Sequence, residues 1–164
     1  MPMIHLVLPA GALSEQARGE LLNSLPKTLL KWEGAPDTAF FRAQAWCRVE
    51  EVAEGGFGAL EDDLPRFRVD VTVPEAALSE RRKAGLVEEV TAQILAAAGV
   101  AEGDALRVWV LIHEQPEGTW GAGGNVVKFK ELAALARGER EKARAAIYSD
   151  RSPGMAEAAR PGAA

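Results

Sequence analysis

The strongest constraint on the fold of this chain is an internal repeat with a period of about 63 residues. The segment that starts at Pro2 reads Pro-Met-Ile-His-Leu-Val-Leu, and the segment that starts at Pro65 reads Pro-Arg-Phe-Arg-Val-Asp-Val. Further pairs at the same offset are Trp46 and Trp109, Glu51 and Glu114, Phe57 and Trp120, and Gly58 and Gly121. These matches occur in chain order, which indicates that one supersecondary unit has been duplicated.

Each half of the repeat has the pattern strand, helix, strand. Apolar residues spaced by three and four predict a helix that follows Ser14 and a matching helix over 79–98, offset by 65 residues. Pro26 lies inside the first helix, so we expect a kink or a break near Leu25. β-rich segments predict the strands, over 3–8 and 41–52 in the first half and over 66–73 and 105–113 in the second.

The connections between these elements predict the fold class. Two strands joined by a helix of this length are parallel neighbours in a right-handed crossover. Two such units form one four-stranded α/β (α+β) sheet with both helices on one face. The other face then has no cover within the chain, which predicts that the protein forms oligomers.

Size and composition fit a single small fold with an appended segment. The chain has 164 residues, of which 48% are apolar and 26% charged, and no apolar run is long enough to cross a bilayer. We predict one domain over 1–127, a helix over 128–147 and a disordered tail over 148–164. The apolar amino-terminal segment has no basic region before it, and one cysteine excludes an internal disulfide framework, so the expected compartment is the cytoplasm.

The distribution of charge argues against a nucleic-acid partner. The formal net charge is −5, and because the residues from Lys128 onward carry an excess of three positive charges, residues 1–127 carry −8. A body this acidic repels phosphate backbones. The basic segment alternates in sign along its predicted helix, which is typical of a solvated surface.

The two repeated prolines differ in their chemistry. If Met1 is removed, Pro2 carries a free secondary amine, whereas Pro65 lies in a tertiary amide that has no basic nitrogen. The repeat therefore predicts a fold, and the difference between its two prolines predicts a single proline-based site at Pro2.

These features resemble the tautomerase superfamily. The pattern of a glutamate, five residues, an aromatic residue and a glycine occurs twice, from Glu51 to Gly58 and from Glu114 to Gly121, each time downstream of a proline. The chain is similar to two subunits of 4-oxalocrotonate tautomerase fused head to tail, as in the longer members of the cis-3-chloroacrylic acid dehalogenase type. The resemblance implies a homotrimer, Pro2 as the catalytic group, a small-molecule substrate, and no cofactor, nucleic acid or membrane partner.

The resemblance also implies further site residues, and here the sequence departs from the family. Trp120 and Phe57 match the aromatic residue that walls the family's pocket. The arginines that bind carboxylates are missing, because Ala12 follows Gly11 and because Trp46 and Trp109 stand at the start of the last strand of each unit. Arg66 and Arg68 are our candidate replacements, with Arg42, Arg48 and Arg107 as further cations.

Three functions remain open at this stage. The first is a tautomerase that interconverts the keto and enol forms of a small 2-oxo acid or related carbonyl compound, with Pro2 as general base. The second is a hydratase or dehalogenase of an unsaturated acid, in which Pro2 is an acid and Asp37 activates water. The third is a non-catalytic trimeric binding protein of the same fold. His5 and His113 are widely separated and lack supporting ligands, so no metal site is predicted.

Overall fold

The computed structural model describes residues 2–150, which fall into two compact units. The first unit is Met1–Lys128 and the second is Phe129–Ala164. In the second unit, helix α4 spans Phe129–Asp150, three residues beyond the end predicted for it. Most of the predicted tail, 151–164, lies outside the described residues. None of the described helices is both long and apolar enough to cross a membrane.

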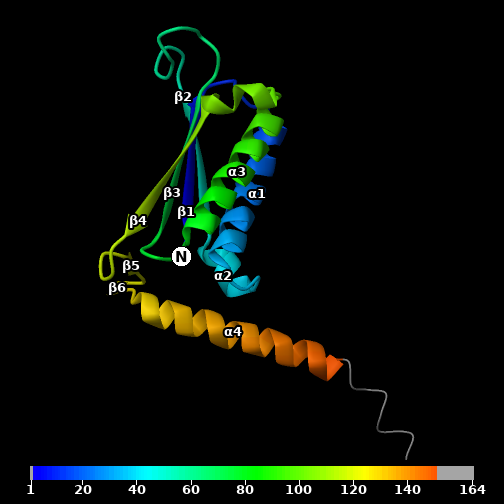
Figure 1. Cartoon of the computed structure of the whole chain (residues 1–164), viewed down its shortest axis with the longest axis vertical. Helices are drawn as coiled ribbons and strands as arrows, with labels where there is room; N and C mark the ends of the chain where they lie inside the picture. The colour runs from blue at the N-terminus through cyan, green and yellow to red at the C-terminus, as the bar shows by residue number, and fades with distance from the viewer. Residues whose placement is uncertain (1, 151–164) are drawn as a thin grey trace, which may run out of the picture. The chain divides into compact units, whose positions relative to one another are not determined.

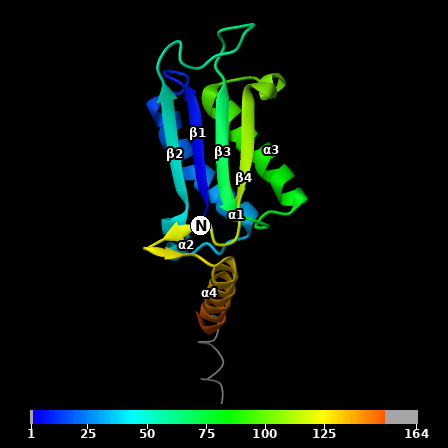
Figure 2. The ribbon, with the colours of Figure 1, turned by 90° about the vertical axis from the view of Figure 1, so that its left-hand side faces the viewer.

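The first unit is built on one four-stranded mixed sheet (Figure 2). Its strands are β1 (Met3–Pro9), β2 (Trp46–Val52), β3 (Phe67–Pro74) and β4 (Val108–Gln115), in the order β2-β1-β3-β4. The pairs β1–β2 and β3–β4 are parallel, and β1 and β3 meet antiparallel in the centre. This is the predicted pair of β-α-β units, joined through their first strands.

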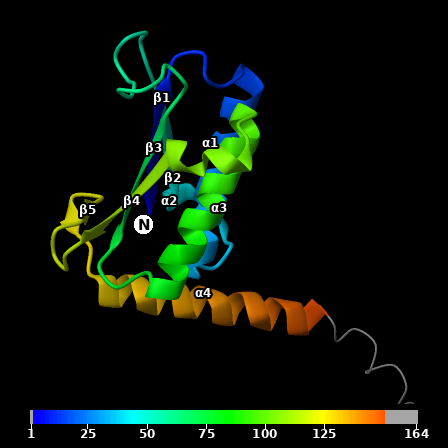
Figure 3. The same cartoon turned by 45° about the horizontal axis from the view of Figure 1, so that its top comes forward.

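Both long helices cover the same face of this sheet (Figures 1 and 3). Helix α1 spans Glu15–Glu33 and helix α3 spans Glu80–Ala98. The core alternates along the central strands, with side chains from Ile4 to Leu8 on β1 and from Phe67 to Val73 on β3 fully buried at every second position. The buried helical positions repeat at the predicted offset of 65: Leu21, Leu25 and Leu29 against Leu86, Val90 and Ile94.

The two helices have matching residues at both ends. The Ser14 hydroxyl accepts a hydrogen bond from the Ala17 amide at 3.1 Å, which caps α1. Ser79 stands at the equivalent position of α3, but its side chain makes no capping hydrogen bond. Each helix stops at a glycine in the left-handed region, Gly34 with φ 68° and Gly99 with φ 64°. The repeat therefore extends to the residues that set the helix lengths.

Three predicted element boundaries were wrong. Helix α1 continues through Pro26, so the break expected near Leu25 does not occur. Residues 39–44 form helix α2 (Ala39–Gln44) and not the start of a strand, since β1 offers no pairing partner before Trp46. In the second half a 3₁₀ helix, η1 (Glu102–Arg107), occupies the first residues of the predicted strand.

The glycine-rich segment after β4 forms a small hairpin that its counterpart in the first half does not form. Strand β5 (Gly121–Ala122) pairs antiparallel with β6 (Asn125–Val126). The turn between them is Gly123 and Gly124, with φ of 59° and 78°, the conformation that two-residue hairpins favour. Residues 53–66, between β2 and β3, contain no strand in the structure.

Candidate active site

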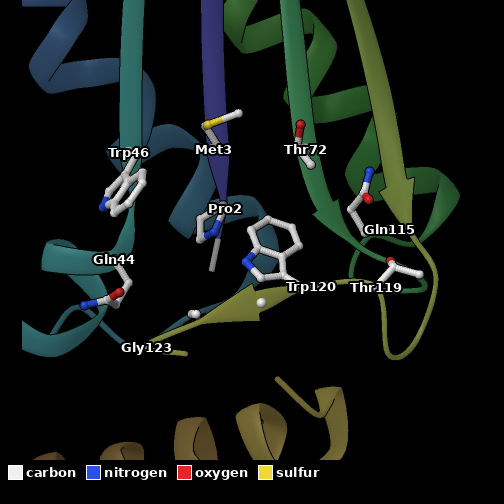
Figure 4. Close-up of a pocket in the computed structure, with 11 residues that line it drawn as sticks. Pro2, Met3, Gln44, Trp46, Thr72, Gln115, Thr119, Trp120 and Gly123 are labelled. Carbon is white, nitrogen blue, oxygen red and sulfur yellow. The ribbon is translucent and has the colours of Figure 1, made fainter. Parts of the chain in front are cut away.

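A cavity of about 670 Å³ opens at the amino-terminal end of β1, where Pro2 lies (Figure 4). It is formed where the start of β1 meets the ends of β3 and β4, the start of β2 and the β5–β6 hairpin. Its lining residues are Pro2, Met3, Gln44, Trp46, Thr72, Gln115, Thr119, Trp120, Gly121, Ala122 and Gly123. Its volume is in the range typical of sites for small molecules.

The backbone holds Pro2 at the edge of this cavity. Pro2 is buried, and its carbonyl accepts a hydrogen bond from the amide of Trp46 at 3.1 Å. That bond extends the parallel ladder of β1 and β2 by one residue, from the pair Met3 and Trp46. The position of Pro2 is therefore set by the central sheet.

Two tryptophans stand on either side of Pro2 in Figure 4. Trp120 comes from the segment that leads into β5, and its carbonyl accepts a hydrogen bond from the Val127 amide at 2.8 Å, which ties it to the far end of the hairpin. Trp46 comes from β2, and its indole N–H donates to the Ala43 carbonyl at 3.2 Å. These two side chains give the cavity flat apolar walls.

Among the described residues, no Asp, Glu, Lys, Arg or His side chain lines the cavity. Its polar groups are the amides of Gln44 and Gln115 and the hydroxyls of Thr72 and Thr119. The two amides have no hydrogen-bond partner within the described part of the chain, so their N–H donors are available to a ligand. A carbonyl oxygen in such a setting can be bound by neutral donors.

The structure places one of the predicted binding residues with Pro2 and the others elsewhere. Trp120 lines the Pro2 cavity. Phe57, Arg66 and Arg68 line a second cavity of about 500 Å³ at the opposite end of the sheet, beside the starts of β3 and β4. Within one protomer these three residues therefore do not meet Pro2, and their role in binding the substrate stays a prediction.

The acid considered for water activation also lies outside the Pro2 cavity. The Asp37 side chain is 86% exposed and forms an ion pair with Arg42 at 2.7 Å. It stands between α1 and α2, with its carboxylate held on the surface. Asp37 is therefore not among the residues that line the Pro2 cavity.

The histidines and the cysteine do not contribute to the cavity either. His5 contacts Glu50 at 3.0 Å on the sheet face away from the helices, and His113 contacts an aspartate of β3. Burial raises the pKa of the Cys47 thiol to about 11, which disfavours the thiolate that a nucleophile needs. Among the described residues no three His, Cys, Asp or Glu side chains form a group that could hold a metal ion.

The reasoning from sequence missed all four residues whose polar side chains line the cavity: Gln44, Thr72, Gln115 and Thr119. Thr72 reaches the cavity because the antiparallel register of β1 and β3 places it opposite Met3. No local pattern predicts that register. Gln115 lies directly after Glu114 of the repeated motif, and its position was the one signal that could have indicated a site residue.

Comparisons with known proteins agree with this architecture. Residues 68–130 match the family model described as "Tautomerase enzyme". The structure of Pt0534 inactivated by 2-oxo-3-pentynoate superposes with a TM-score of 0.65 at 18% identity, over 76% of this chain and 94% of that one. N1, a member of the cis-3-chloroacrylic acid dehalogenase family, gives 0.64 at 15% identity, over 85% and 96%.

The wild-type F6 fused 4-OT, an asymmetric trimer, gives a TM-score of 0.62 at 17% identity, over 76% of this chain and 94% of that one. The chain matches no curated protein in sequence. The fold is that of the tautomerase superfamily, whose members include tautomerases, macrophage migration inhibitory factors and a dehalogenase family. The resemblance seen in the sequence is thus confirmed for the fold, and the match to the family model falls mainly on the second β-α-β unit.

Proposed function

We propose that this protein is a cofactor-independent tautomerase in which the free amine of Pro2 is the general base. The substrate class is a small carbonyl compound, such as a 2-oxo acid, that exchanges between keto and enol forms. The observation that carries the proposal is the position of Pro2 in a cavity whose lining side chains are all uncharged.

The reaction follows from the groups at the cavity. The neutral Pro2 nitrogen takes the hydroxyl proton of the enol, and the substrate becomes an enolate. The resulting ammonium returns that proton to the adjacent carbon, where the electrons of the C=C bond form the new C–H bond and the oxygen lone pair forms the carbonyl. The side-chain amides of Gln44 and Gln115, which line the cavity, are the donors that we propose for the enolate oxygen.

The lining also indicates which substrates the cavity accepts. The indoles of Trp46 and Trp120 offer planar apolar surfaces, so an enol conjugated to an aromatic ring fits better than a dicarboxylate. A dicarboxylate needs cations to bind its two charges, and no lysine or arginine lines this cavity within one protomer.

The hydratase alternative needs a carboxylate within reach of a water in the cavity. Neither Asp37 nor any other carboxylate lines it, so the tautomerase is the function that the geometry supports better.

We also propose that the protein is a homotrimer. The sheet face away from the helices exposes large apolar side chains, with Trp46 at 64% and Trp109 at 66% exposure, and Met3 and Leu111 at 38% and 36%. Such a face is covered in a stable protein. The fused 4-OT structures with this fold are trimers, which supports three copies as the arrangement that covers it.

The test is the variant Pro2→Ala, assayed on the enol of phenylpyruvate by its ultraviolet absorbance. Loss of the secondary amine should lower kcat/KM by about 100-fold, in the range that a positioned general base contributes. Mass spectrometry should show that Met1 is absent from the active protein. Light scattering should give the same oligomer for the variant and the wild type, so that the loss is not one of assembly.

Two results would overturn the proposal. Unchanged activity in Pro2→Ala would exclude Pro2 as the base. A wild-type protein that assembles but turns over neither phenylpyruvate nor related enols would leave the non-catalytic binding protein as the function of this fold.

A further inference from the structure

The second cavity is the internal duplicate of the Pro2 cavity. Six of its lining residues correspond to lining residues of the Pro2 cavity at the offset of 63: Arg66 to Met3, Arg107 to Gln44, Trp109 to Trp46, Phe57 to Trp120, Gly58 to Gly121, and Ala59 to Ala122. Because β1 and β3 run antiparallel, the two cavities lie at opposite ends of the sheet. The two cavities are therefore lined by equivalent positions of the two units, and they differ in the chemical groups at those positions.

The second cavity has guanidinium groups where the first cavity has the amine of Pro2. The proline of the second unit, Pro65, lies within the chain and has no free nitrogen. In its place the cavity is lined by three arginines, Arg66, Arg68 and Arg107, where the Pro2 cavity has no charged side chain. Proton transfer by a proline is impossible there, but recognition of an anion is favoured.

Two of these arginines, Arg66 and Arg107, are held in place by ion pairs with aspartates. The Asp62 carboxylate accepts hydrogen bonds from Nη1 and Nη2 of Arg66, at 2.9 and 3.0 Å, and from Nη1 of Arg107 at 3.2 Å. Asp104 contacts Nε of Arg107 at 3.2 Å. The hydrogen bonds from Arg66 hold the pKa of Asp62 well below its usual range, so this carboxylate stays ionised and keeps the arginines fixed.

The arginines retain donors for a ligand. Within the described residues, Nη2 of Arg107 has no partner, and the side chain of Arg68 is half exposed with a single carboxylate contact, to Asp70 at 3.0 Å. Asp62, Asp104 and Asp70 balance the charge of the three arginines. Attraction to an anion here therefore depends on directed N–H donors, which suit a planar carboxylate.

The rest of the lining is apolar and aromatic. Phe57, Phe67 and Trp109 contribute rings, and Leu106 and Leu111 contribute aliphatic side chains. Leu106 is 89% exposed in the protomer, so a ligand that covers it removes apolar surface from water. The volume of about 500 Å³ accepts a molecule with a single ring.

We propose that this second cavity is a non-catalytic binding site for a monocarboxylate with an aromatic or other apolar body, separate from the site at Pro2. The carboxylate is bound by Arg68 and Nη2 of Arg107, and its apolar body lies between Trp109 and Phe57. Each chain then carries two sites of common origin, of which one transfers protons and the other binds an acid.

The test is a titration of the full chain with phenylacetate, followed through the indole N–H signals of its tryptophans by ¹H–¹⁵N NMR. The Trp109 signal reports on the second cavity, Trp46 and Trp120 report on the first, and Trp32 in α1 is an internal reference. We expect a saturable shift of the Trp109 signal, and an affinity for neutral phenylacetamide at least tenfold lower.

Two variants remove the donors without leaving a buried charge. Arg68→Gln leaves Asp70 with His113, and Arg107→Gln leaves Asp62 with Arg66 and introduces the residue found at the equivalent position 44. Each should weaken phenylacetate at Trp109 by about tenfold, as expected for a charge-assisted hydrogen bond. Arg81→Gln, on the exposed face of α3, is the matched control and should bind as the wild type.

The proposal is overturned if the Trp109 signal does not move, if phenylacetamide moves it as readily as phenylacetate, or if Arg68→Gln binds with unchanged affinity. If Arg107→Gln does not fold, Arg68→Gln decides alone. The Pro2→Ala variant should bind phenylacetate at Trp109 normally, so failure of the tautomerase proposal and failure of this one are distinguishable.

Discussion

The two halves of the sheet share a backbone and differ in chemistry. Each unit has the same strand, helix and strand, the same serine before its helix and the same glycine after it. In the first unit, Pro2 lies near the start of the sequence, in a cavity that no charged side chain lines among the described residues. In the second unit, Pro65 lies inside the chain, and three arginines line the cavity. The residues that the two units share build the core and the helix ends, and the residues that differ line the two cavities.

The largest effect should come from blocking the amine of Pro2. Insertion of one glycine between Met1 and Pro2 converts its nitrogen to an amide, as in Pro65, and should reduce kcat/KM for the phenylpyruvate enol by about 10²- to 10⁴-fold. Pro65→Ala should leave activity within about twofold. A blocked Pro2 that retains activity, or a Pro65→Ala variant that loses it, would break the distinction between the two prolines.

The ends of the two helices differ by a buried acid. Helix α1 ends in Glu33, where α3 has Ala98 at the offset of 65. Among the described residues, Oε1 of Glu33 is buried without a hydrogen-bond partner. Burial raises the pKa of this carboxyl from 4.5 to about 7, and the charge of the amino terminus lowers it in part. The first unit therefore includes a carboxylate whose ionisation opposes folding.

The sign of the pH effect follows from that shift. Below about pH 4.5 the Glu33 carboxyl is protonated in folded and unfolded chains alike, so its ionisation does not lower the free energy of unfolding. Between pH 4.5 and 7 the unfolded chain loses its proton first, and the free energy of unfolding falls as the pH rises. Above pH 7 the Glu33 carboxyl is ionised in both states, and its burial lowers the free energy of unfolding by the full amount.

Glu33→Gln should remove this cost. We expect the variant to gain about 2 kcal/mol of stability at pH 8 relative to pH 4, somewhat less than the full shift implies, because the residue as a whole is only half-buried. Urea unfolding at both pH values measures it. Glu88→Gln, at an exposed position of α3, is the control and should show no such difference. An equal effect of Glu33→Gln at both pH values would contradict the assignment.

The smallest effect concerns the turns after β1 and β3. Gly11 has φ of 80°, and Ala76, its equivalent at the offset of 65, has φ of 61°. The turns match in hydrogen bonding too, from Ala12 to Pro9 at 3.2 Å and from Ala77 to Pro74 at 3.0 Å. The second unit therefore has a side chain in a backbone conformation that favours glycine.

Ala76→Gly should relieve this strain and stabilise the protein by about 0.5–1 kcal/mol, and Gly11→Ala should destabilise it by about 1 kcal/mol. Thermal unfolding of the two variants beside the wild type measures both changes. If both substitutions shift Tm in the same direction, the two turns are not equivalent.

The sequence by itself determined the architecture of this protein. Periodicity and the repeat predicted two β-α-β units and one sheet with both helices on one face, because apolar spacing is a local property that each element carries. Pro2 as the candidate base also followed from the sequence, since the chemistry of a terminal amine needs no tertiary contact. The helix at residues 39–44 was misjudged because the register of β2 against β1 decides where the strand begins.

Only the tertiary structure decided which side chains share a cavity. The antiparallel pairing of β1 and β3 brings Thr72 and Gln115 to Pro2 and sends Arg66 and Arg68 to the opposite end of the sheet. That pairing joins residues about 70 positions apart, and its register depends on how the whole core packs. The sequence predicted one site and its base, and the fold divided the proposed partners of that base between two cavities.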